Sequence, residues 1–310
     1  MSAALPELPE WIAAQLPAGG RRRMVEVGDG LAMHVQEWGP PDGRAVVLVH
    51  GNPTWGYLWR KVIDAIRGRP GGAALRLIVP DLIGLGLSSK PHELAAHTLP
   101  HHGAWLGAAL DQVAPAQPFV LVAQDWGGPI GLHACLERGA RLRGIVFGNT
   151  AISPPAAKFR PTLFHRLSQL PLASDLLFRE LGFPLGLLHL SQGDRGSIRG
   201  DVARAYRWPL RTRADRAAPL ALARMVPDSR THPSVPELER TQALFASARV
   251  PVALVWGMRD PILGRVVNHL ARLRPDASVH RTDAGHFLQE EVPGPLADAT
   301  LDVVARASWS

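Results

Sequence analysis

The stretch that decides the fold is VLVAQDWGGPIGLH, residues 120–133. It opens with an apolar run of strand length, passes through Gln124, Asp125 and Trp126 to two glycines, and closes with an apolar segment of helical character. Pro129 fits the first turn of that helix, where backbone N–H groups have no intrahelical partner. The stretch therefore predicts a strand, a sharp turn and a helix, with Asp125 at the turn.

Similar short apolar runs recur along the chain, and most of the gaps between them are long enough for a helix. Buried strands that alternate with helices are typical of a parallel sheet covered on both faces. Residues 23–30 and 31–38 instead alternate apolar with polar around Gly28-Asp29-Gly30, which predicts a hairpin. The apolar runs lie at residues 45–51, 75–81, 119–125, 142–149 and 250–257, with a weaker one at 277–286.

This alternation stops between about 153 and 245. The intervening sequence is rich in Leu, Arg and Pro, and its apolar residues have helical spacing. We interpret residues 153–245 as a helical cap inserted between two parts of one α/β core, residues 1–152 and 246–310.

Composition narrows the class of protein. The 310 residues are 46 % hydrophobic and 20 % charged, as in a globular protein, and no apolar run reaches the roughly 18 residues of a membrane span. The N-terminus has no signal-peptide pattern, and one Cys excludes an internal disulfide framework. We expect a cytoplasmic protein. The formal net charge is +7, but the arginines are dispersed, so we expect no nucleic-acid partner. The lack of a spanning run leads us to expect no membrane partner.

The nucleophile elbow lies in such a strand, sharp turn and helix, and in serine hydrolases its sequence is G-x-S-x-G. Here the central position holds Asp125. Open parallel sheets place their sites at the carboxyl ends of the strands, where this turn lies. The alternative is an ordinary loop that carries an exposed Asp.

Two residues downstream could serve this nucleophile. Asp260 follows the run at 250–257, and His286 follows the last run, which is the order nucleophile, acid, His. Asp260 could instead be a turn residue or a helix N-cap, and His286 a structural histidine. The position after the fourth run, where a competing acid could lie, holds Asn149, which carries no charge. Asp283 is expected to be a loop residue.

Five stretches carry a family resemblance. The chain resembles the haloalkane dehalogenases of the α/β-hydrolase superfamily, with small departures at SSKP, where SDKP is commoner, and at Tyr57, where Ser is frequent. The resemblance implies an α/β-hydrolase fold with a mostly parallel, eight-stranded sheet and an inserted cap. It also implies a catalytic triad of Asp125, His286 and Asp260. The matching stretches are HGNPTWGYLWR (50–60), DLIGLGLSSKP (81–91), QDWGG (124–128), WGMRDPILG (256–264) and GHFLQEE (285–291).

The activity implied by the resemblance is hydrolytic dehalogenation through an alkyl ester of Asp125. The carboxylate displaces halide from an sp³ carbon, and His286, oriented by Asp260, then activates water against the ester. Asn52 and Trp126 are expected to supply backbone N–H groups to the oxyanion hole and side-chain N–H groups to the halide. The expected partners are a small apolar halogenated substrate and a halide ion, with no cofactor and no metal.

Two alternatives use the same fold. An epoxide hydrolase shares the Asp nucleophile and the His but protonates the epoxide with two cap tyrosines. This chain has only Tyr57 and Tyr206, of which only Tyr206 lies in the predicted cap. A noncatalytic ligand receptor is the other alternative, and an intact triad argues against it.

Overall fold

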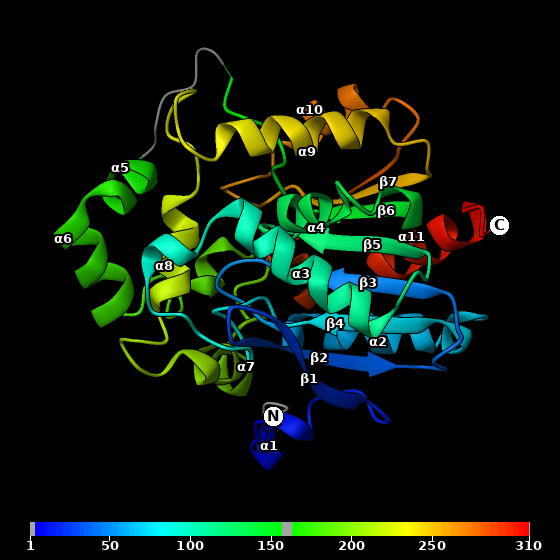
Figure 1. Ribbon diagram of the computed structural model, residues 1–310, viewed down its shortest axis with the longest axis horizontal. Coiled ribbons are helices and arrows are strands. Elements are labelled where there is room, and N and C mark those ends of the chain that lie inside the picture. Colours follow the sequence, from blue (N-terminus) through cyan, green and yellow to red (C-terminus); the bar gives the residue numbers. More distant parts are fainter. Residues whose placement is uncertain (1–3, 157–162, 310) are drawn as a thin grey trace.

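A single twisted sheet forms the centre of the computed structural model, which describes residues 4–156 and 163–309 (Figure 1). The sheet has eight strands in the order β1-β2-β4-β3-β5-β6-β7-β8. The strands are β1 (Arg21–Gly28), β2 (Leu31–Trp38), β3 (Ala45–Val49), β4 (Arg76–Pro80), β5 (Phe119–Gln124), β6 (Leu142–Gly148), β7 (Val252–Gly257) and β8 (Ser278–Thr282).

The pairing confirms the predicted mostly parallel sheet. The strands from β4 through β3 and β5 to β8 pair in parallel, whereas β1 and β2 form the predicted antiparallel hairpin and β2 pairs antiparallel with β4. Every residue of β3, β4, β5 and β7 is buried, which explains why these strands have apolar rather than alternating sequences.

Helices cover both faces of the sheet and create two apolar cores. On one face α2 (Arg60–Arg67) and α11 (Pro293–Arg306) pack together. The other face is covered by α3 (Leu99–Val113), α4 (Gly127–Cys135), α9 (Val235–Ser247) and α10 (Val267–Leu273). Short 3₁₀ turns occupy Gly56–Trp59, Gly72–Ala74, Leu94–Ala96, Gly139–Arg141, Leu188–Ser191, Trp208–Leu210 and Leu288–Glu290, and α1 is Glu10–Ala13.

The chain between β6 and β7 forms helices and no strand within its described residues. They are α5 (Leu163–Gln169), α6 (Pro171–Ser174), a π-helical turn at Asp175–Glu180, α7 (Gly200–Arg207) and α8 (Ala217–Arg224). The helix α9 runs across the predicted cap boundary at 245 and packs against α4, and residues 157–162 of the predicted cap lie outside the described residues. The boundaries 153–245 therefore stay a prediction. Among the helices described, none is both long enough and apolar enough to cross a bilayer.

A buried charge cluster joins these parts. The Arg60 guanidinium donates to both carboxylate oxygens of Glu290, at 2.5 and 2.8 Å, and the Tyr206 hydroxyl donates to Glu290 Oε1 at 2.6 Å. The side chains of Arg60 and Glu290 are 6 % and 0 % exposed. Arg60 begins α2, Glu290 lies four residues after His286, and Tyr206 belongs to α7. The cluster thus fastens the inserted helices to the core beside the predicted histidine.

We predict that Arg60→Ala lowers the free energy of unfolding by about 1.5–3 kcal/mol, because the buried Glu290 carboxylate loses its bidentate partner and keeps only Lys61 Nζ at 3.1 Å and the Tyr206 hydroxyl. Urea unfolding followed by circular dichroism measures this change. The matched control is Arg69→Ala, which removes the exposed ion pair with Asp298 and should cost less than about 1 kcal/mol. Equal losses in the two variants would show that the buried cluster has no special stabilising effect.

Candidate active site

Asp125 occupies a strained turn directly after β5. Its φ is +51°, a left-handed conformation that a non-glycine residue adopts only when its surroundings impose it. Its backbone N–H donates to the Asn149 carbonyl at 3.0 Å. The following helix approaches β3 so closely that a Cβ on Gly127 would lie 2.2 Å from the Val49 carbonyl oxygen. The glycine therefore permits the elbow, and the elbow presents Asp125 at the carboxyl edge of the sheet.

The three residues of the predicted triad lie together at this edge. His286 Nδ1 is 2.8 Å from Asp260 Oδ2, and His286 Nε2 is 3.5 Å from Asp125 Oδ2. Asp125, Asp260 and His286 follow β5, β7 and β8, which are parallel strands of one sheet. The three side chains therefore lie at the same carboxyl edge. The side chains of His286 and Asp260 are 4 % and 0 % exposed, whereas Asp125 is 18 % exposed. Asp125 is thus the most exposed side chain of the three.

Asp260 is held as an anion by its hydrogen bonds. Burial alone raises the pKa of this carboxyl, but His286 and donors from Asn149 and Ile262 outweigh it and lower the pKa. Asn149 Nδ2 and the Ile262 backbone N–H each lie 2.7 Å from the carboxylate oxygens they bind. Asn149, which the sequence excluded as an acid, therefore supports the acid from the neighbouring strand.

The His286 imidazole lies between the carboxylates of Asp260 and Asp125. Burial lowers the pKa of its imidazole, but the carboxylates of Asp260 and Asp125 outweigh burial and raise that pKa to about 10. The protonated form of the imidazole is consequently favoured at neutral pH. Loss of either negative charge makes His286 easier to deprotonate.

Gln124 is a site residue that the sequence analysis missed. Its side-chain amide donates to the His286 carbonyl at 3.1 Å and lies 3.2 Å from His286 Nε2. Its Oε1 is buried with no hydrogen-bond partner in the described part of the chain. Gln124 thus holds His286 through its backbone carbonyl, with the amide against the ring edge that faces Asp125. Its place immediately before Asp125 was the available signal, but the sequence does not reveal its contact with a residue 162 positions away.

Asn52 reaches Asp125 through its backbone. The Asn52 N–H donates to Asp125 Oδ1 at 2.8 Å, whereas its side-chain Nδ2 donates to the Pro219 carbonyl of α8 at 3.0 Å. Trp126 is 7 % exposed, and its indole N–H has no hydrogen-bond partner among the described residues. Within the described residues, 4–156 and 163–309, no hydrogen bond joins the Trp126 backbone N–H to Asp125. The structure thus brings the Asn52 backbone N–H to the carboxylate, whereas the donor role of Trp126 stays a prediction.

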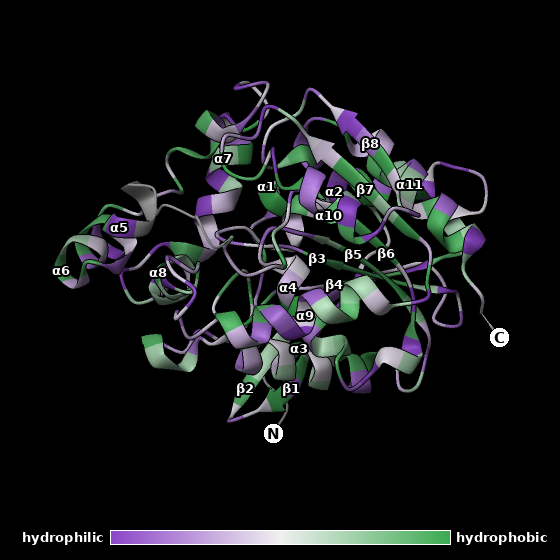
Figure 2. Cartoon of the chain, turned by 90° about the horizontal axis from the view of Figure 1, so that it is seen from above, coloured by the Kyte–Doolittle hydropathy of each residue, from purple (hydrophilic) through white to green (hydrophobic). Residues whose placement is uncertain are grey.

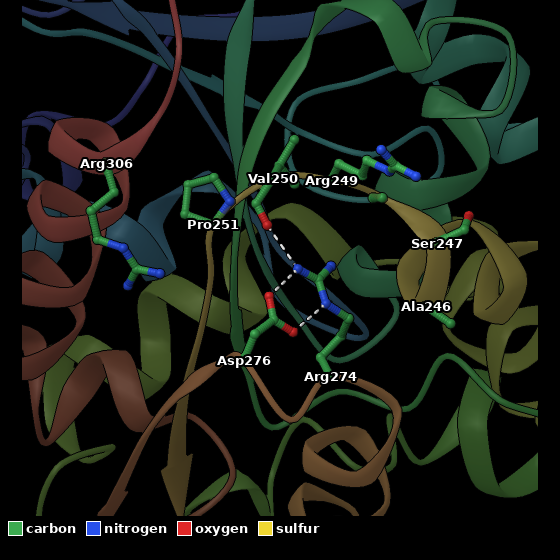
Figure 3. Close-up of a pocket in the computed structure, with 9 residues that line it drawn as sticks. Ala246, Ser247, Arg249, Val250, Pro251, Arg274, Asp276 and Arg306 are labelled. Atoms are coloured by element: carbon green, nitrogen blue, oxygen red, sulfur yellow. Dashed lines mark hydrogen bonds and ion pairs between the residues drawn. The ribbon is translucent and has the colours of Figure 1, made fainter.

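A separate surface depression of about 480 Å³ lies at the other edge of the sheet (Figure 3). Pro251, which precedes β7, lines it, together with Arg274 and Asp276. Arg274 donates to both carboxylate oxygens of Asp276 and to the Val250 carbonyl, so its N–H groups are largely used. Because it adjoins the amino end of β7, this depression is not part of the triad site.

Comparison with known proteins agrees with this geometry. Residues 44–293 match the family model described as alpha/beta hydrolase fold. A haloalkane dehalogenase from Mycobacterium marinum is 32 % identical over 274 residues, which are 87 % of this chain and 88 % of that protein. The chain belongs to the haloalkane dehalogenase family. A crystal structure of a variant of the haloalkane dehalogenase DatA from Agrobacterium tumefaciens, at 24 % identity, has a TM-score of 0.82 and covers 94 % of this chain and 99 % of that one, which shows the shared fold.

One similar protein is named for a different reaction. The cis-3-alkyl-4-alkyloxetan-2-one decarboxylase of Xanthomonas campestris is 32 % identical over 279 residues, which are 87 % of this chain and 91 % of that protein. The family model and the dehalogenase relatives confirm the predicted fold and family. The roles of the individual site residues stay predictions.

We predict that Asp125→Asn lowers the pKa of His286 by at least about one unit, because the substitution removes one of the two carboxylate charges that raise it. NMR titration of protein labelled in its histidines measures the shift, with the spectrum of His286→Gln as the assignment control. Asp260→Asn, which removes the other charge, should also lower the pKa. An unchanged pKa in Asp125→Asn would show that the two side chains are not electrostatically coupled.

Proposed function

We propose that this protein hydrolyses haloalkanes to an alcohol, a halide ion and a proton, with Asp125 as nucleophile, His286 as base and Asp260 as the acid that orients it. The observation that carries the proposal is a carboxylate at the nucleophile elbow, partly exposed and 3.5 Å from an imidazole that a second carboxylate holds. Membership of the haloalkane dehalogenase family supports the choice of substrate class.

In the first step an Asp125 oxygen attacks the carbon that bears the halogen. A carbon–oxygen bond forms, the carbon–halogen bond breaks, and the halide leaves with the electron pair. No proton moves in this step, so a carboxylate that is already ionised serves better than a serine hydroxyl, which needs a base. The product is an alkyl ester of Asp125.

The ester changes the chemistry of His286. An esterified Asp125 has no charge, so one cause of the high pKa of His286 disappears and the imidazolium releases its proton. The neutral ring then takes a proton from water as the water oxygen attacks the ester carbonyl carbon. The Asn52 backbone N–H, 2.8 Å from Asp125 Oδ1, is placed to stabilise the resulting oxyanion. Collapse expels the alkoxide, which takes the remaining proton of the added hydroxyl, so the alcohol leaves and Asp125 is a carboxylate again.

We assign halide binding to the side-chain N–H groups of Trp126 and Asn52. The indole N–H has no other partner in the described residues, and the Asn52 amide has a second hydrogen besides the one given to Pro219. Negative charge that develops on a halogen in an apolar site is costly unless donors meet it. Neutral donors also permit release of the ion, which a cationic side chain would retain.

The proposed organisation follows from the same contacts. Residues 153–245 form the cap between core segments 1–152 and 246–310, and the bond from Asn52 to Pro219 of α8 joins the cap to the site. A small apolar halogenated substrate suits a site between these parts. The one cysteine, Cys135, is buried as a free thiol, which suits the cytoplasm as the proposed location.

Epoxide hydrolysis has less support because both tyrosine hydroxyls are engaged elsewhere. The Tyr206 hydroxyl donates to Glu290 at 2.6 Å, and the Tyr57 hydroxyl donates to Gln15 at 2.5 Å. The two rings lie 5.4 Å apart, edge to face, inside one buried cluster. Neither hydroxyl is free to protonate an epoxide over Asp125.

Decarboxylation of an oxetan-2-one is the second candidate, favoured by the relative from Xanthomonas campestris. That reaction divides the lactone ring into carbon dioxide and an alkene and consumes no water. The pairing of His286 with Asp260 instead suits a reaction in which water is activated, which is why hydrolysis comes first. Parallel assays with 1-bromobutane, styrene oxide and a cis-dialkyl oxetan-2-one distinguish bromide, diol and alkene as products. Turnover of any of them would exclude a noncatalytic receptor.

We predict that His286→Ala still reacts with 1-bromobutane and then stalls as the butyl ester, because only the second step needs the base. Intact mass spectrometry should show one added butyl group, and peptide mapping should place it on Asp125. Asp125→Ala is the control and should remain unmodified. Steady turnover by His286→Ala, or a butyl group on another residue, would contradict the proposed roles.

We predict that Asn52→Ala and Trp126→Phe each slow bromide release from 1-bromobutane by about a hundredfold, the effect of losing one preorganised donor. Stopped-flow measurement of the first turnover isolates the step in which halide leaves. Circular dichroism checks that the fold survives. If both variants release bromide at nearly the wild-type rate, the halide site lies elsewhere, for instance at Trp208 in the cap.

A further inference from the structure

Several leucines of the segment between β6 and β7 face solvent. Leu172, Leu176 and Leu181 are 88 %, 57 % and 71 % exposed. Single exposed leucines are common on protein surfaces, but a cluster of them on one segment marks a site of interaction. Leu170, Leu187 and Leu190, each about half exposed, extend the same region.

A π-helical turn aligns the first three leucines. Leu172 and Leu176 are four residues apart, the spacing of neighbours on one face of an α-helix. Asp175–Glu180 then adopts π geometry, and the Leu181 N–H donates to the Leu176 carbonyl five residues earlier, at 3.0 Å. Residues five apart are the neighbours in a π-helix. The extra residue therefore keeps Leu181 in line, and Leu172, Leu176 and Leu181 form a leucine row.

The opposite side of this segment is well packed. Phe178, within the same π turn, is 1 % exposed and clusters with Leu220 and Ala223 of α8. The leucine row is therefore the outer face of an anchored helix. In both views α5 and α6 project at one end of the molecule, away from the sheet (Figures 1 and 2). The row therefore lies on a protruding part of the surface.

Positive charge accompanies the leucines. Residues 153–245 contain fourteen Lys and Arg against eight Asp and Glu, an excess of six, while the whole chain has a net charge of +7. Nearly all the net charge therefore lies in this segment. The π turn holds Arg179 and two acids, Asp175 and Glu180. Three more arginines bind this helix through its acids, carbonyls or Ser174, namely Arg213, Arg216 and Arg224, which leaves positive charge in excess around the leucine row.

We propose that the leucine row and its arginines dock this protein on an anionic lipid bilayer. Leucines enter the boundary between headgroups and acyl chains, while the excess positive charge of the segment attracts the anionic headgroups. A second copy of the chain is a poorer occupant because two such surfaces, each with excess positive charge, repel one another. The absence of a membrane partner was expected from the lack of a spanning segment, and a peripheral surface needs no such segment.

The leucine row lies close to the proposed active site, so docking would bring that site to the bilayer. The row packs through Phe178 onto α8, and α8 receives the hydrogen bond from Asn52 at its Pro219 carbonyl. One helix thus separates the docking surface from the proposed active site. Apolar substrates concentrate in bilayers, so a docked protein would collect them there. Docking itself does not depend on the proposed reaction.

Co-sedimentation with vesicles tests the proposal. The full chain is mixed with vesicles of phosphatidylcholine alone or of an equal mixture of phosphatidylcholine and phosphatidylglycerol. We expect at least about tenfold stronger partitioning onto the anionic vesicles, weakened by salt. The variant Leu172→Ser/Leu176→Ser/Leu181→Ser should lose at least about tenfold of that binding. Leu5→Ser, which alters a leucine that is 44 % exposed outside the segment, is the matched control and should bind like wild type.

Three results would overturn the proposal. They are no binding of wild type to anionic vesicles, equal binding by the triple variant, and a wild-type oligomer in sedimentation velocity that the triple variant converts to monomer. The last result would make the row an interface between copies. Circular dichroism confirms that the triple variant is folded; if it is not, Leu172→Ser alone, at the most exposed position, should still reduce binding.

Discussion

The turn at Asp125 is the constraint on which the rest of the structure depends. A positive φ at this residue points its carboxylate away from the sheet, and the turn is possible only because Gly127 brings α4 against the Val49 carbonyl without a Cβ. The same turn places the Asn52 N–H 2.8 Å from the carboxylate. One backbone conformation therefore positions the nucleophile and its first hydrogen-bond donor, and the parallel sheet supplies the other two members of the triad.

Charge then connects geometry to chemistry. Asp260 and Asp125 flank one buried imidazole and raise its pKa to about 10, so the resting site favours a protonated His286. Esterification of Asp125 removes one anion and makes His286 a better base at the moment when a base is required. A serine in place of Asp125 would lack this coupling because its resting form is neutral.

Much of the site was predictable from sequence because it follows chain order. Asp125, Asp260 and His286 each come after an apolar run, and strands of a parallel sheet carry such residues to one edge. The roles of Gln124 and Asn149 were not predicted, because they arise from contacts between residues far apart in the sequence. The Arg60–Glu290 pair is invisible for the same reason, and the leucine row depends on a π turn that no spacing rule for α-helices predicts.

The most direct test of the central claim, that Asp125 forms a covalent ester, is a single turnover of 1-bromobutane in H₂¹⁸O with enzyme in excess. If water attacks the ester carbonyl, the butanol of the first turnover contains unlabelled oxygen from Asp125, and the ¹⁸O is found in the peptide that carries Asp125. If water instead displaced bromide directly, the first butanol would carry the ¹⁸O and the Asp125 peptide would remain unlabelled, which would contradict the account.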